Sequence, residues 1–233
     1  MRRRSDLLPL LILLAVGHLY AAPTTHPLLG TVYTQAPPAA DFTLTDQHGK
    51  PFHMADTRGK VVVLSFLYTH CTDYCPFMAV KLMRSARLLG PAMSGVVMVP
   101  VTTDPRRDTP QVLAEYSKTL GMLDSWHFVT GSLSSMRGVW KDYFIGVEAA
   151  EEHHGASAAA ANPEDANGVM RGLSATDKEE LVGRIINKFG GGYEVSHDTP
   201  FWIVDKRGIL RVSLGADATP ADIAFDVRSL LAE

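Results

Sequence analysis

Short apolar runs alternate with amphipathic segments along most of this chain. Residues 61–67 read Val-Val-Val-Leu-Ser-Phe-Leu, a continuous apolar run that predicts a strand buried on both faces. Apolar positions then recur at helical spacing from Pro76, which predicts a helix, and residues 95–101 predict a second buried strand. The next helix is expected at residues 110–120, because Thr109 is suited to its N-cap and Gly121 to its end.

Later segments continue the alternation of strands and helices. We predict a strand at 126–130, a helix at 133–143, strands at 201–205 and 209–213, and a final helix from Thr219-Pro220 to Leu231. The turn Lys206-Arg207-Gly208 between two of these strands indicates a hairpin. This order predicts an α/β sheet with a thioredoxin-like arrangement.

Residues 148–192 interrupt this alternation of strands and helices and are expected to form an insert. The first half, with Ala156–Ala161 and Asn162-Pro163, has the composition of an exposed loop. The second half contains an apolar stripe over residues 181–189, and Thr176 and Glu179 have the spacing of a capping box. We therefore expect one amphipathic helix there, ending at Gly190.

The N-terminus has the pattern of an export signal. Three arginines precede an apolar run that begins at Leu7, and residues 7–25 carry no Asp, Glu, Lys or Arg. Residues 1–22 are thus expected to be a cleaved signal peptide or a retained membrane anchor, with the domain on the exported, periplasmic side. Residues 23–40 are rich in proline and predict a linker, which leaves residues 41–233 as the domain.

Composition narrows the functional classes. The chain has 22 Lys+Arg and 25 Asp+Glu residues, a net charge of −3, which argues against a nucleic-acid partner. Its 46% hydrophobic content supports a packed core. The two cysteines, Cys71 and Cys75, are too few for a multi-bridge scaffold or a four-cysteine zinc site.

The cysteines lie between a predicted buried strand and a predicted helix N-terminus, in Cys71-Thr-Asp-Tyr-Cys75-Pro76. Free N–H groups and the helix dipole at such a position favour the thiolate. A disulfide between them would close a very small loop and stabilise the fold by only about 2 kcal/mol. Two functions remain open: a thiol–disulfide oxidoreductase using the pair, or a site for a soft metal such as Cu(I).

A metal site would need a third ligand, for which histidine is suited. His197 directly precedes the predicted strand at 201–205, in a loop that should face the cysteine loop of a thioredoxin-like sheet. His70 adjoins Cys71 but is expected to point elsewhere, and His48 is expected in a solvated turn. His153 and His154 follow two glutamates in the insert, where a solvated loop is expected in preference to a second copper site.

These stretches together resemble the Sco/SenC family of copper-binding assembly proteins. The resemblance rests on segments that cover much of the domain: Asp41–Leu44, Gly59–Pro76 with its Thr-His-Cys-x-x-x-Cys-Pro block, Thr103–Pro110, Trp126–Gly131, and Tyr193–His197 before 201–205. It implies a thioredoxin fold and one copper site, Cu(I) or Cu(II), made by Cys71, Cys75 and His197. Asp73 matches an acidic position in the family's cysteine loop, as an outer-sphere group or Cu(II) ligand.

The resemblance further implies a metallochaperone that helps to assemble the copper centre of cytochrome c oxidase. The partner would be the copper-centre subunit or another copper chaperone, and membrane contact would come only through the N-terminal segment. An exported thiol–disulfide oxidoreductase using Cys71 and Cys75 is the alternative, so an enzymatic role stays open. Two departures are the long insert and Asp198-Thr199-Pro200 after the histidine; we predict a cis Thr199–Pro200 bond.

Overall fold

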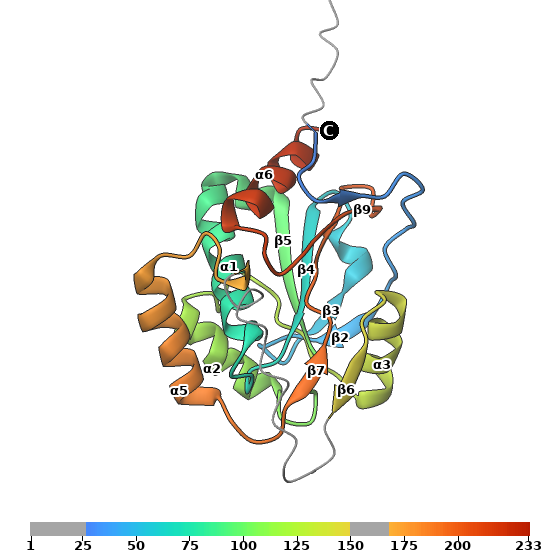
Figure 1. Ribbon diagram of the computed structural model, residues 1–233. Helices are drawn as coiled ribbons and strands as arrows, with labels where there is room; N and C mark the ends of the chain where they lie inside the picture. Colours follow the sequence, from blue (N-terminus) through green and yellow to red (C-terminus); the bar gives the residue numbers. More distant parts are fainter. Residues whose placement is uncertain (1–26, 150–167) are drawn as a thin grey trace, which may run out of the picture.

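The computed structural model describes residues 27–149 and 168–233, and its centre is a five-stranded sheet (Figure 1). The strand order is β1-β9-β8-β4-β5, in which β4 (Val61–Leu67) and β5 (Val96–Thr102) are parallel. β8 (Phe201–Val204) is antiparallel to both β4 and β9 (Leu210–Leu214). β1 (Thr31–Val32) pairs with β9 at the edge. The α/β thioredoxin-like prediction is confirmed in element order and sheet topology.

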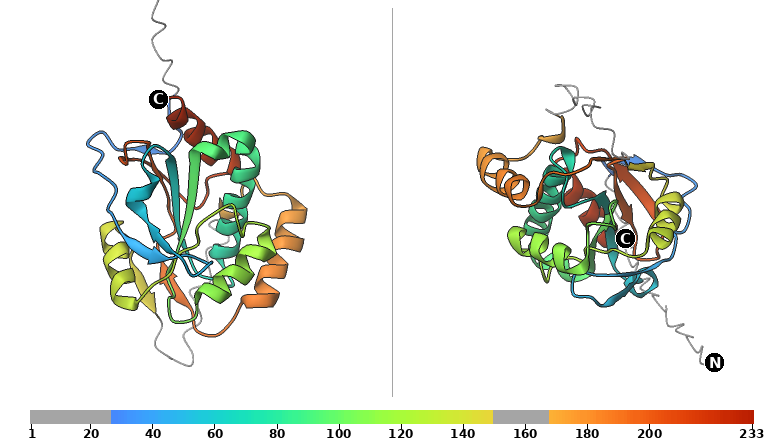
Figure 2. Two further views of the ribbon diagram at one scale, coloured as in Figure 1. Left: turned by 180° about the vertical axis from the view of Figure 1, so that it is seen from behind. Right: turned by 90° about the horizontal axis from the view of Figure 1, so that it is seen from below.

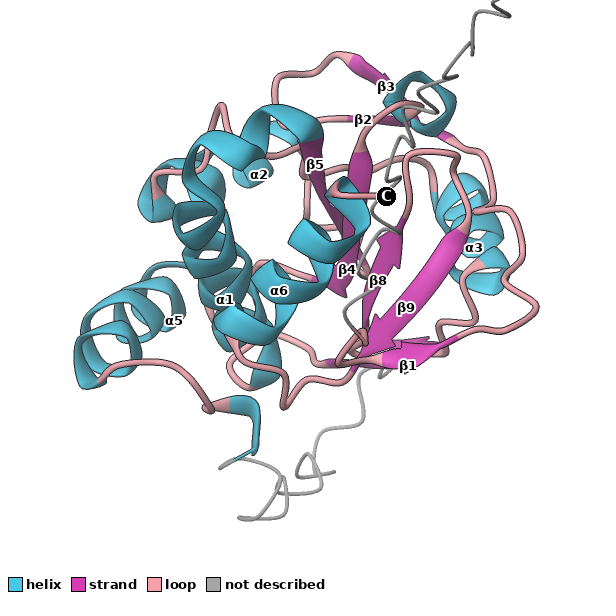
Figure 3. Cartoon of the chain, turned by 90° about the horizontal axis from the view of Figure 1, so that it is seen from above, coloured by secondary structure: helices cyan, strands magenta, loops and turns pink. Residues whose placement is uncertain are grey.

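Helices cover both faces of the sheet (Figures 2 and 3). α1 (Tyr74–Leu89) and α6 (Pro220–Leu231) pack on one face, where Val61 and Val63 of β4 meet them. α3 (Leu133–Asp142) packs on the other, against Leu64 and Phe66. Every residue of β4 is buried, which explains its continuous apolar sequence.

Smaller elements surround this framework. They are β2 (Thr43–Thr45), β3 (Pro51–His53), the 3-10 turns η1 (Met54–Thr57) and η2 (Gly90–Gly95), α2 (Pro110–Leu120), β6 (Val147–Ala149), the π-helical η3 (Asp177–Val182), α5 (Gly183–Phe189) and β7 (Val195–His197). β2 pairs with β3, and β6 pairs with β7, each as a separate two-stranded sheet. The β6–β7 pair joins the start of the insert region to its end.

The predicted helix signals are largely confirmed. Thr109 accepts a hydrogen bond from the N–H of Val112, and Gly121 ends α2 with a φ of +67°. Thr219 and Asp222 form a capping box at α6. α1 begins at Tyr74, two residues before Pro76, because a proline in the first turn removes no intrahelical hydrogen bond.

Three local predictions are wrong. Residues 126–130 form isolated bridges and no regular strand, from Val129 to Val101 and from Thr130 to Thr45, because the segment changes its hydrogen-bond partner from β5 to β2 between these two residues. The capping box is made by Ser174 and Asp177, not by Thr176 and Glu179: the N–H of each residue donates to the side chain of the other. The helix therefore begins two residues earlier than predicted.

The third wrong prediction is the cis peptide at Thr199–Pro200. No cis peptide bond occurs in the described residues, so this bond is trans. Residues 29–39, inside the predicted linker, are held against the domain: the N–H groups of Leu29 and Gly30 donate to Asp226 and that of Ala39 donates to the carbonyl of Gly208.

The predicted signal or anchor at 1–22 and the loop with His153 and His154 lie outside the described residues. Across residues 27–149 and 168–233, no helix combines the length and the apolar character needed to cross a bilayer.

Candidate metal and thiol site

The two cysteines lie where β4 gives way to α1. Cys71 is in the connecting turn and Cys75 is in the first turn of the helix. Both side chains are buried in the core cluster, with exposed fractions of 5% and 0%, and neither is in a disulfide. The backbone N–H of Asp73 donates to Cys71 Sγ at 3.4 Å.

The two thiols have different acidities. A hydrogen bond from Cys75, together with backbone N–H groups of Cys75 and Asp73, lowers the pKa of Cys71. Burial, and then the interaction with Cys71, raise the pKa of Cys75 well above its usual range. Cys71 is therefore the thiol that ionises first, and Cys75 is the thiol that keeps its proton.

His197 meets the cysteines from the opposite side. Its Nε2 lies 3.3 Å from Cys75 Sγ, and its Nδ1 lies 2.8 Å from the carbonyl oxygen of Asp198. Because a carbonyl oxygen only accepts hydrogen bonds, Nδ1 carries the proton and Nε2 presents its lone pair to the thiol. Burial lowers the pKa of His197, which keeps the ring neutral near pH 7.

Asp198, unexpected from the resemblance, anchors the histidine strand. Its carboxylate accepts the N–H of Gly146 at 2.8 Å, and its own N–H donates to the carbonyl of Gly146. These bonds extend the β6–β7 ladder, in which Val147 pairs directly with His197. The hydrogen bond at Nδ1 thus orients the imidazole, and the ladder joins its strand to β6.

The other predicted residues occupy the margin of the site. Asp73 is exposed, and partial burial and the nearby charge of Glu194 raise its pKa. Within the described chain its carboxylate has no hydrogen bond, and its link to Cys71 is through the backbone. The ring nitrogen Nδ1 of His70 lies 2.8 Å from the Thr69 hydroxyl and 3.7 Å from the Asp108 carboxylate.

A tyrosine and a glutamate that sequence reasoning missed connect the two sides. The Tyr68 hydroxyl donates to Glu194 at 2.6 Å and accepts the N–H of Val195 at 3.1 Å. The ring of Tyr68 meets His197 edge-on, with centroids 5.8 Å apart. The pKa of Tyr68 is raised by burial and by the nearby thiols and Glu194, so the hydroxyl stays a donor. The position of Tyr68, directly after the buried strand, is the signal that could have drawn attention to it.

Arg107 fixes the loop that leads to the histidine strand. Its guanidinium donates to the carbonyls of Gly191 (2.9 Å) and Tyr193 (2.8 Å) and pairs with Asp104. It also stacks on the ring of Tyr193 at 3.7 Å. Gly192 has a φ of +84°, a conformation that favours glycine, and a Cβ there would lie 2.7 Å from the Arg107 Nη1 atom. One side chain therefore joins the turn after β5 to the approach to β7.

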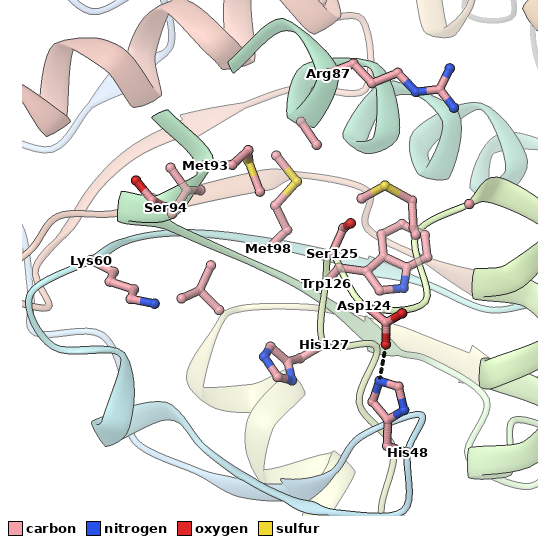
Figure 4. A pocket seen from close by; sticks show the side chains of 15 residues that line it. His48, Lys60, Arg87, Met93, Ser94, Met98, Asp124, Ser125, Trp126 and His127 are labelled. Carbon is pink, nitrogen blue, oxygen red and sulfur yellow. Dashed lines mark ion pairs between the residues drawn. The ribbon is translucent and has the colours of Figure 1, made fainter. Parts of the chain in front are cut away.

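A separate cavity lies beside β5 (Figure 4). It has a volume of about 600 Å³ and is bordered by Met93, Met98, Trp126 and His127. His48, expected in a solvated turn, pairs there with Asp124 at 3.7 Å. None of the three predicted metal-site residues lines it.

The three predicted ligands form a chain of contacts and do not surround a common point. Cys75 contacts both Cys71 and His197. In the described parts of the molecule, no three His, Cys, Asp or Glu side chains are arranged to hold a metal ion as they stand. In a tetrahedral zinc site, a sulfur ligand at about 2.3 Å and a nitrogen ligand at about 2.0 Å from the ion lie about 3.5 Å from each other. The observed distance between Cys75 Sγ and His197 Nε2, 3.3 Å, is close to this separation.

The fold and site define a thioredoxin-like protein that holds a reduced cysteine pair against a neutral imidazole. The family model SCO1/SenC matches residues 32–163, more than half of the chain. The chain belongs to the SCO1/SenC family.

Relatives and solved structures agree with this assignment. A Bos taurus "Protein SCO2 homolog, mitochondrial" is 41% identical over 112 residues, 45% of this chain and 40% of that protein. A Rickettsia felis "SCO2-like protein" is 33% identical over 105 residues, 42% of this chain and 47% of that protein. The chain thus spans less than half the length of these curated relatives.

Three solved structures share the fold. Apo Sco1 from Thermus thermophilus superposes with a TM-score of 0.63 at 24% identity, covering 89% of this chain and 99% of that one. Copper-bound ScoI from Bradyrhizobium japonicum gives 0.61 at 21% identity, covering 84% and 100%. BsSco, described as a member of the Sco family of cytochrome c oxidase assembly proteins with a disulfide switch, gives 0.58 at 20% identity, covering 86% and 97%.

Proposed function

We propose that this protein is a copper metallochaperone that binds one copper ion through Cys71, Cys75 and His197. The observation that carries the proposal is the 3.3 Å contact between Cys75 Sγ and the unprotonated Nε2 of His197. An ion that displaces the shared proton would find a sulfur and a nitrogen ligand already side by side.

The chemistry of the donor set favours copper. Two thiolates and one imidazole are soft to intermediate ligands, which select Cu(I). The hydrogen bond from Nδ1 to the carbonyl of Asp198 is the outer-sphere contact that orients a ligating histidine. Asp73, at the exposed margin, is proposed as the outer-sphere or additional oxygen ligand when the ion is Cu(II).

The proposed recipient is the copper centre of cytochrome c oxidase, or another copper chaperone. This proposal is supported by family membership and by the copper-bound and assembly-protein descriptions of the structural relatives. Residues 1–22 are proposed to export the domain to the periplasmic side, as a cleaved signal or as an anchor.

The test is anaerobic titration of the fully reduced protein with Cu(I) in competition with a chromophoric chelator. We expect one tightly bound equivalent, no tight binding in Cys75→Ser, and an affinity lowered by more than about 100-fold in His197→Ala. Ser196→Ala, on the same strand with an exposed side chain, is the matched control and should bind normally. Unchanged binding in His197→Ala would overturn the ligand set.

The unequal acidities of Cys71 and Cys75 favour a second function, that of a thiol–disulfide reductase of exported proteins. Cys71 would attack the target disulfide, and Cys75 would resolve the mixed disulfide, leaving this protein oxidised and the target reduced. A reductase assay separates the two functions, because His197→Ala should lose copper while it keeps this activity. Loss of both would assign the thiols to copper alone.

A further inference from the structure

A small pocket opens beside the strand that carries His197. Val147, which pairs with His197 in the β6–β7 ladder, and Val195, two residues before it, both line the pocket. Side chains two residues apart on a strand share a face, so the pocket and the imidazole lie on the same side of β7. The pocket has a volume of about 90 Å³, space for a group of only a few heavy atoms.

The pocket contains a buried polar group without a partner. Thr103 lines it and is 2% exposed, and its hydroxyl makes no hydrogen bond within the described structure. Buried hydroxyls are normally hydrogen-bonded, and this one is free to bond a polar group that enters the pocket. The neighbouring Asp104 does not need that guest, because Tyr193 donates to one of its oxygens and Arg107 pairs with the other.

The positive charges that line the pocket indicate which chemical group it binds. Arg106 and Arg137 both line the pocket with exposed side chains, and neither has an ion-pair or hydrogen-bond partner among the described residues. A guanidinium presents a planar fork of donors that matches a carboxylate. Trp140, Leu133 and the two valines supply apolar walls against which a short methylene stem would pack.

We propose that this pocket receives an aspartate or glutamate side chain of the protein that exchanges copper with the Cys–His site. This inference rests on the proposed function. A guest inserted here would bring its own protein surface against His197, because Val147 and Val195 border both the pocket and the imidazole. Arg106 and Arg137 would hold the carboxylate, and the Thr103 hydroxyl would donate to it.

The binding test uses NMR of the reduced, copper-free protein with N-acetyl-aspartate N-methylamide as the probe, at constant ionic strength. We expect saturable shifts of the Thr103, Val147 and Val195 resonances, absent with the asparagine analogue and in the double variant Arg106→Gln/Arg137→Gln. Arg87→Gln, an exposed arginine outside this pocket, is the control. Equal shifts with the asparagine analogue, or a preference for inorganic phosphate, would overturn the assignment.

The functional test follows copper transfer to the soluble copper-centre domain of cytochrome c oxidase by stopped-flow. The double variant should bind one copper with unchanged affinity but transfer it about tenfold more slowly at low salt, with a weaker salt dependence. Normal binding and an unchanged transfer rate would overturn this inference and leave the proposed function standing. Absence of copper binding in the wild type would instead remove the proposed function, while the NMR titration still reports on the pocket.

Discussion

The two halves of the site are built by different means. Cys71 and Cys75 lie at the junction of β4 and α1, and both thiols belong to the apolar core. His197 lies on β7, which pairs only with the short β6 and is outside the five-stranded sheet. Apolar packing places the cysteines, whereas hydrogen bonds with Tyr68, Arg107 and Asp198 place the histidine and its strand.

This difference assigns separate tasks to the two halves. A thiol pair in a packed core keeps its spacing as long as the domain is folded. A histidine on a two-stranded ribbon can shift without disturbing the sheet, because short ribbons have little stability of their own. The proposed binding and release of copper would benefit from one fixed and one adjustable side. From this comparison we predict that polar substitutions near β7 change the copper affinity of the site. Substitutions along α1 should change mainly the free energy of unfolding.

The largest effect is expected from Arg107→Ala. It removes two hydrogen bonds to the 191–193 loop and leaves the buried Asp104 carboxylate without its cation, so we expect a loss of about 3 kcal/mol in the free energy of unfolding. Cu(I) affinity should fall as well, since the approach to β7 is released. Urea unfolding and chelator competition measure both.

Arg106→Ala is the matched control for that prediction, because the neighbouring arginine is exposed and makes no ion pair with the described residues. It should change the free energy of unfolding by no more than about 0.5 kcal/mol. If the two variants unfolded at the same urea concentration and bound copper equally, the polar anchoring of the histidine half would be refuted.

A smaller effect, on the cysteine half, concerns Lys81 of α1. Its side chain is buried, its Nζ donates to the carbonyl of Ala216 at 2.6 Å, and burial lowers the pKa of Lys81 to about 8. Between pH 8 and about 10.5 the unfolded chain holds a proton that the folded protein has released. The free energy of unfolding therefore rises with pH across this window, on the order of 2 kcal/mol.

Lys81→Met should lack this rise. The free energy of unfolding of the wild type minus that of the variant should therefore increase as the pH rises from 8. Taking the difference removes the contribution of Cys71 and Cys75, which both proteins share. Lys118→Met, at a half-exposed position on α2, is the control and should leave the pH profile unchanged. A constant difference from pH 7 to 10 would contradict the buried position of the charge.

The sequence predicted best what depends on neighbouring residues. The strand at 61–67, the cap of α2 at Thr109 and the hairpin around Gly208 follow from local patterns of apolar and turn residues, and all three are present. Cys75 and His197 were brought together by the predicted topology, and the structure places them in contact. The ligand set itself remains a proposal.

Long-range polar contacts were not predictable in the same way. Tyr68 and Glu194 are separated by 126 residues, and no periodicity indicates that one will donate to the other. Arg107 is one of two adjacent arginines, and only the fold shows which of them reaches the 191–193 loop. Caps were ambiguous for a related reason: residues 174–180 contain two overlapping Ser/Thr-x-x-acid patterns, and packing selects between them.

The smallest predicted effect tests that selection. Asp177 is buried and pairs through its other oxygen with Arg84 of α1, which draws the helix start to Ser174 and leaves Thr176 inside the first turn. Ser174→Ala should therefore cost about 1 kcal/mol of stability, and Thr176→Ala should cost nothing, since alanine suits a helical position better than threonine. Thermal unfolding compares them. Equal losses, or a greater loss in Thr176→Ala, would place the cap at Thr176. Copper affinity should stay unchanged in both, because Arg107 holds the loop between this helix and His197.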